Sequence, residues 1–192
     1  MQIFMVLARI LLTILWLCWL TFWILAARRT AANLRMETLL TGASYRIPLV
    51  LGIFLMILQR LPLPPLNLTL WPPTPLIVAA SFVLIVAGLA FTVWARFHLG
   101  KYWSGRVTLK ADHRVIQTGP YAWVRHPIYS GLILALLGTT LTIGTLQACA
   151  GFVLISLSFV RKLQIEEVWL RSYFGAEYER YQKRVKALIP YL

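Results

Sequence analysis

The sequence predicts an all-α integral membrane protein with about five transmembrane helices. Of its 192 residues, 59% are hydrophobic and the mean hydropathy is +0.72, which is too apolar for an ordinary soluble domain. Long uncharged runs alternate with basic connections. The net charge of +13 comes from 19 basic and 6 acidic residues. Because the bases lie between apolar runs, they indicate a membrane protein and not a nucleic-acid-binding one.

The first half of the chain predicts three spans. Residues 10–27 are 18 uncharged residues, enough to cross a bilayer. A cleaved signal peptide is the alternative, but the length and the basic residues that follow favour a retained helix. Residues 47–58 form an apolar run of only 12 residues. This span must therefore tilt, extend upstream with Arg46 at the membrane interface, or enter the membrane only partway. Residues 60–75 hold six of the ten prolines and predict a loop, and residues 74–95 predict the third span.

The longest uncharged run covers residues 127–160 and contains 34 residues. It is too long for one crossing and short for two. Gly144 lies at its middle, which favours a tight hairpin of two short helices. We expect the following segment to leave the membrane as a helix that ends near Gly175, with an amphipathic helix after it. The expected total is five spans.

The basic residues predict the orientation of these spans. Residues 28–46, 96–126 and 161–186 hold 17 of the 19 lysines and arginines. The positive-inside rule places these three segments in the cytoplasm. With five spans, the N-terminus lies outside and the C-terminus in the cytoplasm, in a bacterial inner membrane or in the endoplasmic reticulum.

Other familiar kinds of site are missing from the sequence. Cys18 and Cys149 each lie in an apolar run and are expected to be buried thiols without a disulfide. The three histidines have no cysteine or carboxylate at usual ligand spacing, so no metal site is expected. There is no P-loop, G-x-G-x-x-G or G-x-S-x-G motif. Any cofactor pocket must therefore form between the ends of the spans, the third connection and the C-terminal helices.

The third connection carries one candidate for such a pocket. "RVTL" and "RVIQTG" predict short extended pieces, closed by turns at Asp112-His113 and Gly119-Pro120. His126 precedes Pro127, which suits the first position of a helix. Unpaired N–H groups at this helix start favour an anionic ligand group.

Aromatic and basic residues crowd the same helix start. Tyr121 and Tyr129 add ring faces and hydroxyls beside it. For Arg125 and Trp123 taken alone, an interfacial aromatic-basic belt is the alternative.

The C-terminal segment supplies the second candidate. Glu166 and Glu167 are two of only six acids. On a helix, Glu167 is placed to pair with Arg171 and Glu166 with Lys162, both ordinary surface pairs. Beside a site that receives a cation, this acidic pair becomes a candidate ligand.

Together, "TGPYAWVRHPIYSG", a membrane hairpin and "EEVWLRSYFGAEYERYQKRV" resemble the isoprenylcysteine carboxyl methyltransferase family and its relatives, the phospholipid methyltransferases. The resemblance covers about residues 99–192. It implies an integral membrane methyltransferase that uses S-adenosylmethionine, with residues 1–95 as N-terminal spans and 96–192 as methyltransferase core of a single domain. The cofactor residues that it implies are Thr108, His113, Arg114, Val115, Ile116, Tyr121, His126, Pro127, Ile128, Tyr129 and Glu166.

The resemblance also suggests a division of roles. Glu166 is expected to bind the cofactor's ammonium, the helix start its carboxylate, and Val115 with Ile116 its adenine. The implied acceptor is the carboxylate of an isoprenylcysteine-like or other lipid-linked molecule, either a membrane lipid or a prenylated small molecule or peptide. Arg161 and Lys162 are expected to bind it, although eukaryotic members place an arginine at the Lys162 position. Neither nucleic acid nor an obligate protein partner is expected.

Three other functions stay open at this point. An acceptor carboxylate is already ionised and needs no base, so no catalytic residue is assigned. A phospholipid amine N-methyltransferase would need one, and Glu167 is then the candidate. An NADPH-dependent sterol-type reductase is the second alternative, because such reductases share a related membrane architecture. A non-catalytic small lipid-binding membrane protein is the third.

Overall fold

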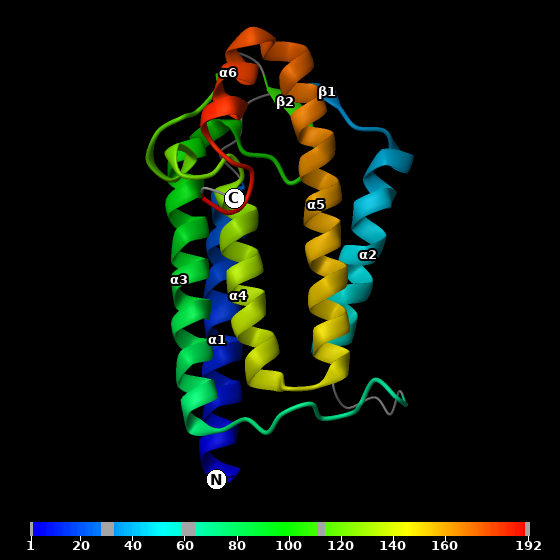
Figure 1. Ribbon diagram of the computed structural model, residues 1–192, viewed down its shortest axis with the longest axis vertical. Helices are drawn as coiled ribbons and strands as arrows, with labels where there is room; N and C mark the ends of the chain where they lie inside the picture. The colour runs from blue at the N-terminus through cyan, green and yellow to red at the C-terminus, as the bar shows by residue number, and fades with distance from the viewer. Residues whose placement is uncertain (1, 28–32, 59–63, 111–113, 191–192) are drawn as a thin grey trace.

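The computed structural model describes residues 2–27, 33–58, 64–110 and 114–190. In these residues five long helices run along the long axis of the molecule, and a short sixth helix lies across one end (Figure 1). The helices are α1 (Gln2–Ala26), α2 (Leu39–Ile57), α3 (Pro75–Leu99), α4 (Pro127–Ile143), α5 (Leu146–Phe174) and α6 (Ala176–Arg184).

The predicted all-α membrane class is confirmed. Helices α1, α2, α3 and α5 are long and apolar enough to cross a membrane, and α4 is a shorter apolar helix of 17 residues. The second span, whose apolar run has only 12 residues, reaches a sufficient length because α2 begins upstream of that run. Upstream extension was one of the three possibilities that the sequence left open. The Thr38 hydroxyl accepts from the Thr41 N–H and begins the helix there, and Arg46 lies within it. Thr74 caps the start of α3 in the same way.

The hairpin differs from the expectation of two short helices. Gly144 does form the turn, with a φ of 73° that favours glycine. Helix α5, however, runs for 29 residues to Phe174 without a break. The first charge, at Arg161, does not end the helix, because no proline or glycine follows until Gly175. The expected exit helix is therefore the upper part of α5, and its predicted end at Gly175 is confirmed.

Two pairs of helices pack closely through small residues. A Cβ atom on Gly88 of α3 would lie 2.4 Å from the Gly131 carbonyl oxygen of α4, so the two backbones touch. Gly52 of α2 and Gly151 of α5 approach each other in the same way, at 2.8 Å. Such contacts are typical of membrane helices, where close backbone packing replaces hydrophobic burial. The bundle thus consists of an α3–α4 pair and an α2–α5 pair, which are visible as separate columns in Figure 1.

Helix α1 attaches to the α3–α4 pair through tryptophans. The Trp19 indole N–H donates to the Thr92 hydroxyl at 2.7 Å, and that of Trp16 donates to the Thr139 hydroxyl at 3.2 Å. The opposite face of α1 is exposed. Cys18 lies on that face, so the expectation that both thiols are buried is wrong for Cys18, whereas both cysteines are free as predicted.

A small antiparallel ribbon joins the first and third connections. Strand β1 (Asn33–Met36) pairs with β2 (Thr108–Lys110), and Met36 lies opposite Thr108. "RVTL" thus becomes part of a strand, but its partner is β1. "RVIQTG" forms no strand and leads into a 3₁₀ turn at Gly119–Ala122. The predicted turn at Asp112-His113 lies outside the described residues, whereas that at Gly119-Pro120 is confirmed.

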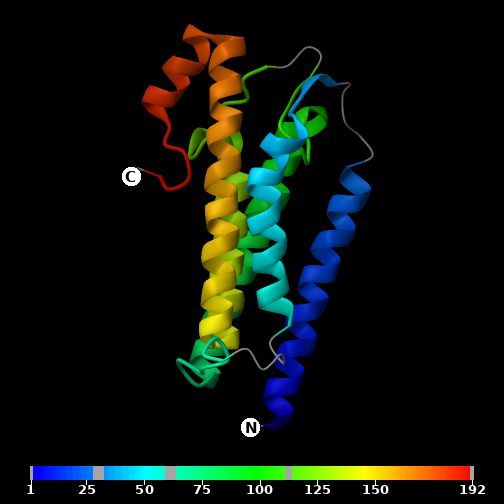
Figure 2. The same cartoon turned by 90° about the vertical axis from the view of Figure 1, so that its right-hand side faces the viewer.

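The two ends of the bundle differ in what they carry. The N-terminus and the loop before α3 lie at one end, and the ribbon, the third connection and α6 lie at the other (Figures 1 and 2). The two segments that carry the predicted site therefore come together at one end of the membrane helices.

Candidate functional site

A cavity of about 400 Å³ lies where the third connection meets the upper ends of the helices. This volume is in the range of small-molecule sites. All five long helices contribute to its wall. The lining includes Trp19, Trp23, Leu49, Leu99, Tyr102, Trp103, Ser104, Gly105, Arg106, Val107, Thr108, Tyr121, Arg125, His126, Pro127, Ile128, Tyr129, Leu132, Phe159, Lys162, Glu166, Trp169 and Leu170. We call it the main pocket.

A second hollow of about 70 Å³ adjoins the main pocket. Leu99, Tyr121, Arg125 and Leu170 line both, so the two are parts of one recess. The lining of the smaller hollow also includes Arg114, Val115, Ile116, Phe174, Tyr178 and Tyr181.

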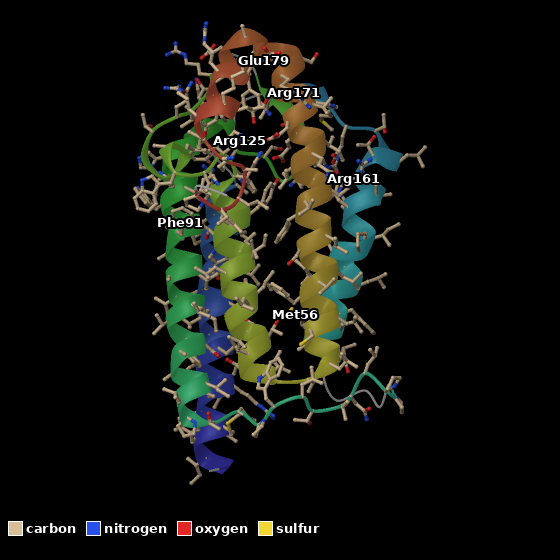
Figure 3. All side chains as sticks on the ribbon, viewed as in Figure 1. Met56, Phe91, Arg125, Arg161, Arg171 and Glu179 are labelled. Atoms are coloured by element: carbon tan, nitrogen blue, oxygen red, sulfur yellow. The ribbon has the colours of Figure 1, made fainter. Side chains whose placement is uncertain are left out.

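Most of the predicted cofactor residues meet in this recess. The main pocket contains Thr108, Tyr121, His126, Pro127, Ile128, Tyr129 and Glu166, and the smaller hollow contains Arg114, Val115 and Ile116. His113 lies outside the described residues. Of the two predicted acceptor residues, Lys162 lines the main pocket. Arg161 is exposed on α5 and lines neither hollow (Figure 3).

Glu166 faces the main pocket from α5 and lies beside Tyr129 of α4 and His126, the residue just before α4. The Tyr129 hydroxyl donates to its carboxylate at 2.7 Å, and the His126 Nδ1 atom lies 3.7 Å from the other carboxylate oxygen. The Tyr129 ring stacks between the rings of His126 and Phe159, with centroids 5.7 and 5.4 Å apart. The carboxylate is thus fixed in place while it still borders the pocket, where it can receive a cationic group.

Glu167 lies in a different environment. It accepts from the Arg125 Nε atom at 2.7 Å, from His126 Nε2 at 3.1 Å and, through its other oxygen, from the Gln182 side chain at 2.8 Å. The predicted pairing of Glu167 with Arg171 is therefore wrong. Because α6 folds back over α5, Glu167 lies at an internal interface, and Arg171 is exposed farther along α5 (Figure 3).

Arg125 is a structural residue and not part of an exposed belt. Its side chain is only 10% exposed and forms an ion pair with Glu167 at 2.6 Å. It also donates to the backbone carbonyl of Val185. Arg125 thus ties the start of α4 to both C-terminal helices. The sequence could not reveal this role, since the three segments are far apart along the chain.

The C-terminal tail also changes which N–H groups the start of α4 can offer. The Arg125 N–H donates to the Lys186 carbonyl at 2.8 Å, and the His126 N–H donates to that of Ala187 at 3.0 Å. Pro127 has no N–H. The first-turn donors that remain beside the pocket are therefore those of Ile128 and Tyr129.

Tyr121 joins the two hollows as a neutral group. Its carbonyl accepts from the Tyr181 hydroxyl at 2.6 Å, which holds α6 against the 3₁₀ turn. Burial raises the pKa of the Tyr121 hydroxyl, and the neighbouring Tyr181 and Glu166 raise it further. The phenol therefore stays protonated and serves as a hydrogen-bond donor or a ring surface.

Lys162 also lines the main pocket. Its ammonium donates to the Gly105 carbonyl at 2.8 Å and lies over the rings of Tyr45 and Tyr129, 5.4 and 5.7 Å from their centroids. The predicted Lys162–Glu166 ion pair is not formed: in the part of the chain that the structure describes, no carboxylate lies within 4.0 Å of this ammonium.

Several wall residues could not be predicted from the sequence. Residues 103–107 form one side of the main pocket, and Trp19 and Trp23 of α1 form another. These residues look like ordinary interfacial aromatics or loop residues, and only the folded arrangement brings them to the pocket.

The recess suits a ligand that has both a cationic and an anionic end. Glu166 offers a carboxylate, and Ile128 and Tyr129 offer backbone donors nearby. The Thr108 hydroxyl lines the same pocket and is buried without a hydrogen-bond partner among the described residues. Since buried polar atoms are normally paired, it is a further group for a ligand to satisfy.

Fold and site together define a multi-pass membrane protein with a small-molecule recess at one end of its helices. Residues 80–172 match the sequence model of the isoprenylcysteine carboxyl methyltransferase (ICMT) family. This segment contains the start of α4 and both glutamates of α5. This match confirms the resemblance for residues 80–172.

Individual relatives agree with this match. The chain is 39% identical over 80 residues to a protein-S-isoprenylcysteine O-methyltransferase of Schizosaccharomyces pombe, covering 41% of this chain and 34% of the relative. It is 30% identical over 116 residues to a probable enzyme of the same name from Oryza sativa subsp. indica, covering 60% and 56%. The Arabidopsis thaliana enzyme B is 23% identical over 165 residues, covering 84% and 81%. The chain thus spans only a third to a half of several relatives.

A solved structure supports the fold. A eukaryotic intramembrane Ras methyltransferase, an isoprenylcysteine carboxyl methyltransferase, superposes with a TM-score of 0.54. The alignment covers 77% of this chain and 52% of the other, at 24% sequence identity. The helical membrane architecture is therefore shared.

Proposed function

We propose that the protein is an S-adenosylmethionine-dependent membrane methyltransferase that methylates the carboxylate of an isoprenylcysteine-like or other lipid-linked acceptor. The observation that carries this proposal is the recess itself. It brings the Glu166 carboxylate, the first N–H groups of α4 and the Lys162 ammonium around one cavity at the end of the membrane helices. The match of residues 80–172 to the ICMT family model supports the same conclusion.

The cofactor's two charged groups find complementary partners in the recess. Glu166 would bind the ammonium by a charge-assisted hydrogen bond, and the N–H groups of Ile128 and Tyr129 would bind the carboxylate. The smaller hollow, with Val115, Ile116 and Tyr121, is an apolar and aromatic site for the adenine. His113 and Arg114 are proposed to contribute from the same connection. When bound, S-adenosylmethionine supplies an electrophilic methyl group.

The acceptor is proposed to enter from the membrane. Leu49, Leu132 and Phe159 come from three helices of the two packed pairs and form an apolar part of the main pocket. A lipid chain would lie against these side chains, while its headgroup reaches Lys162. Arg161, which is exposed, would act only outside the pocket. Lys162 suits an anionic headgroup, because an ammonium with one hydrogen bond to Gly105 keeps further donors for a ligand.

The protein's residues act in this reaction by orientation and by exclusion of water. An acceptor carboxylate is ionised at neutral pH, so no residue has to remove a proton. An amine acceptor would need a base, and Glu167 is poorly suited to that role. Its carboxylate is already bound by Arg125, His126 and Gln182, and it does not line the main pocket. We therefore favour carboxyl methylation over amine methylation.

We further propose that the end of the bundle that carries the recess faces the cytoplasm. The basic residues of the third connection and of the tail gather at that end, as the positive-inside rule requires.

Ligand titration tests the cofactor assignment and separates the classes of function. Purified protein in detergent is titrated with S-adenosylmethionine and, separately, with NADPH. We expect saturable binding of S-adenosylmethionine and none of NADPH. Binding of NADPH alone would indicate a reductase, and binding of neither would indicate a lipid-binding protein without this chemistry.

A further inference from the structure

The Lys162 ammonium lies between two tyrosine rings. One is Tyr129, from the family segment, and the other is Tyr45 of α2, which lies outside it. A cation over an aromatic face is attracted by the ring quadrupole without losing its charge. Among the described residues the ammonium forms one hydrogen bond, to Gly105, so it keeps further N–H groups that can donate toward the pocket.

Each ring is fixed by a glutamate behind it. The Tyr129 hydroxyl donates to Glu166 at 2.7 Å, and the Tyr45 hydroxyl donates to Glu37 at 2.5 Å. Arg46 forms an ion pair with the same Glu37 carboxylate, whose side chain is only 2% exposed. The two rings are therefore held independently of Lys162 and form a preformed seat for its ammonium.

Tyr45 is also tied to the helix that carries Lys162. Its carbonyl accepts from the Ser158 hydroxyl at 2.7 Å, and Ser158 lies four residues, one helical turn, before Lys162 on α5. The Tyr45 side chain is itself buried, at 2% exposure, and does not line the pocket. Any effect of Tyr45 on a ligand is therefore indirect, and Lys162 is the charged pocket residue that its ring contacts.

We propose that Tyr45 is a positioning residue that determines acceptor specificity: its ring holds the Lys162 ammonium at the pocket wall and thereby selects anionic over neutral acceptors. A free lysine side chain loses substantial rotamer entropy when it is fixed. The two-ring seat removes most of that cost before the acceptor arrives. This inference rests on the proposed function, since it takes Lys162 as the contact for the acceptor's carboxylate.

The test compares two acceptor analogues that differ only in charge. N-acetyl-S-farnesylcysteine, which is an anion, and its neutral methyl ester are titrated against the wild-type protein, Tyr45→Met and Tyr45→Phe. Methionine fills a similar volume without an aromatic face, whereas phenylalanine keeps the ring. We expect Tyr45→Met to lose about tenfold in affinity for the acid, in the range of a desolvated cation–π contact. Tyr45→Phe should stay within about threefold, and ester binding should not change.

Two further measurements separate positioning from general damage. S-adenosylmethionine affinity should be the same in all Tyr45 variants. In a Lys162→Gln background, which lacks the ammonium, Tyr45→Met should cause no additional loss of acid binding. Tyr173→Met, at an exposed tyrosine of α5, is the matched control and should behave as wild type. If Tyr45→Met does not fold, Tyr45→Leu takes its place.

The possible failures point to different parts of the hypothesis. A wild-type protein that prefers the acid, with a Tyr45→Met variant that keeps this preference, would overturn the role of Tyr45 alone. The role of Tyr45 would also be overturned if Tyr45→Met lost affinity for the acid and the ester equally. It would likewise be overturned if the losses of acid affinity in Tyr45→Met and Lys162→Gln added up in the double variant. A wild-type protein that binds acid and ester equally would overturn the proposed carboxylate acceptor, and this inference with it.

Discussion

The Tyr129 hydroxyl on α4 and the Glu166 carboxylate on α5 form a hydrogen bond of 2.7 Å across the main pocket wall. The bond joins the α3–α4 pair of helices to the α2–α5 pair at the end where the recess lies. It also fixes the carboxylate beside the pocket, so a cationic ligand meets a group that is already oriented. Preorganisation of this kind lowers the cost of binding.

Replacement of Glu166 should selectively weaken binding of the cofactor. We expect Glu166→Gln to lower S-adenosylmethionine affinity by roughly tenfold or more, about 1.4 kcal/mol, as for a hydrogen bond to a charged group. Isothermal titration in detergent measures it. The exposed Glu179→Gln on α6 is the matched control for loss of one negative charge and should bind normally. Unchanged affinity in Glu166→Gln would remove this residue from the site.

Replacement of the neighbouring Glu167 should affect stability. Glu167→Ala leaves Arg125 enclosed without its partner, and breaking such a buried pair costs about 3 kcal/mol or more. We expect thermal unfolding of the detergent-solubilised protein at a temperature lower by roughly 5 °C or more. Arg171→Ala, the partner that helical spacing alone suggests, should unfold like wild type. A stable Glu167→Ala together with a destabilised Arg171→Ala would show that the ion pair is assigned wrongly.

Cysteines introduced at the two ends of the bundle should react with a thiol reagent from opposite sides of the membrane. In a protein whose own cysteines are replaced by serine, we introduce single cysteines at Lys101, Glu179 and Asn67, which are all exposed. Labelling of intact cells with a membrane-impermeant thiol reagent should modify Asn67→Cys and spare the other two, because the recess end is proposed to face the cytoplasm. If Lys101→Cys and Glu179→Cys label from different sides, the two halves of the pocket cannot meet.

Much of the fold could be predicted because membrane helices leave a direct trace in the sequence. Long uncharged runs predict α1 and α3. Gly144 and Gly175 predict the turns after α4 and α5, where the backbone has a positive φ. The errors arose where tertiary contacts decide. The hairpin was predicted as two short helices because Arg161 was taken as a boundary, although helix propensity continues through it to Phe174.

The candidate site could be predicted where its residues are neighbours in the sequence. It could not be predicted where folding brings together residues that are far apart in the sequence. Two local signals, the residue before a proline and a rare acidic pair, indicate the start of α4 and the two glutamates as candidates, and the family resemblance singles out Glu166. The pairing of Glu167 could not be predicted because its partner Arg125 lies 42 residues away, at a contact that only the packing of the start of α4 against α5 creates. Tyr45 gave no signal either, since an isolated tyrosine in an apolar helix is common and its contact with Lys162 depends on the pairing of α2 with α5.

The central claim is methyl transfer to a lipid-linked carboxylate, and a labelled-acceptor assay tests it most directly. Purified protein is incubated with S-adenosylmethionine that carries a labelled methyl group, together with N-acetyl-S-farnesylcysteine and phosphatidylethanolamine in one mixed micelle. A separate incubation contains the methyl ester in place of the free acid. We expect label in the first incubation only in the methyl ester formed from the acid, from which alkali releases it. We expect no label in the second incubation, and a strong loss of label in Glu166→Gln. Alkali-stable label in phosphatidylethanolamine, or no label in any acceptor despite bound cofactor, would contradict carboxyl methylation by this site.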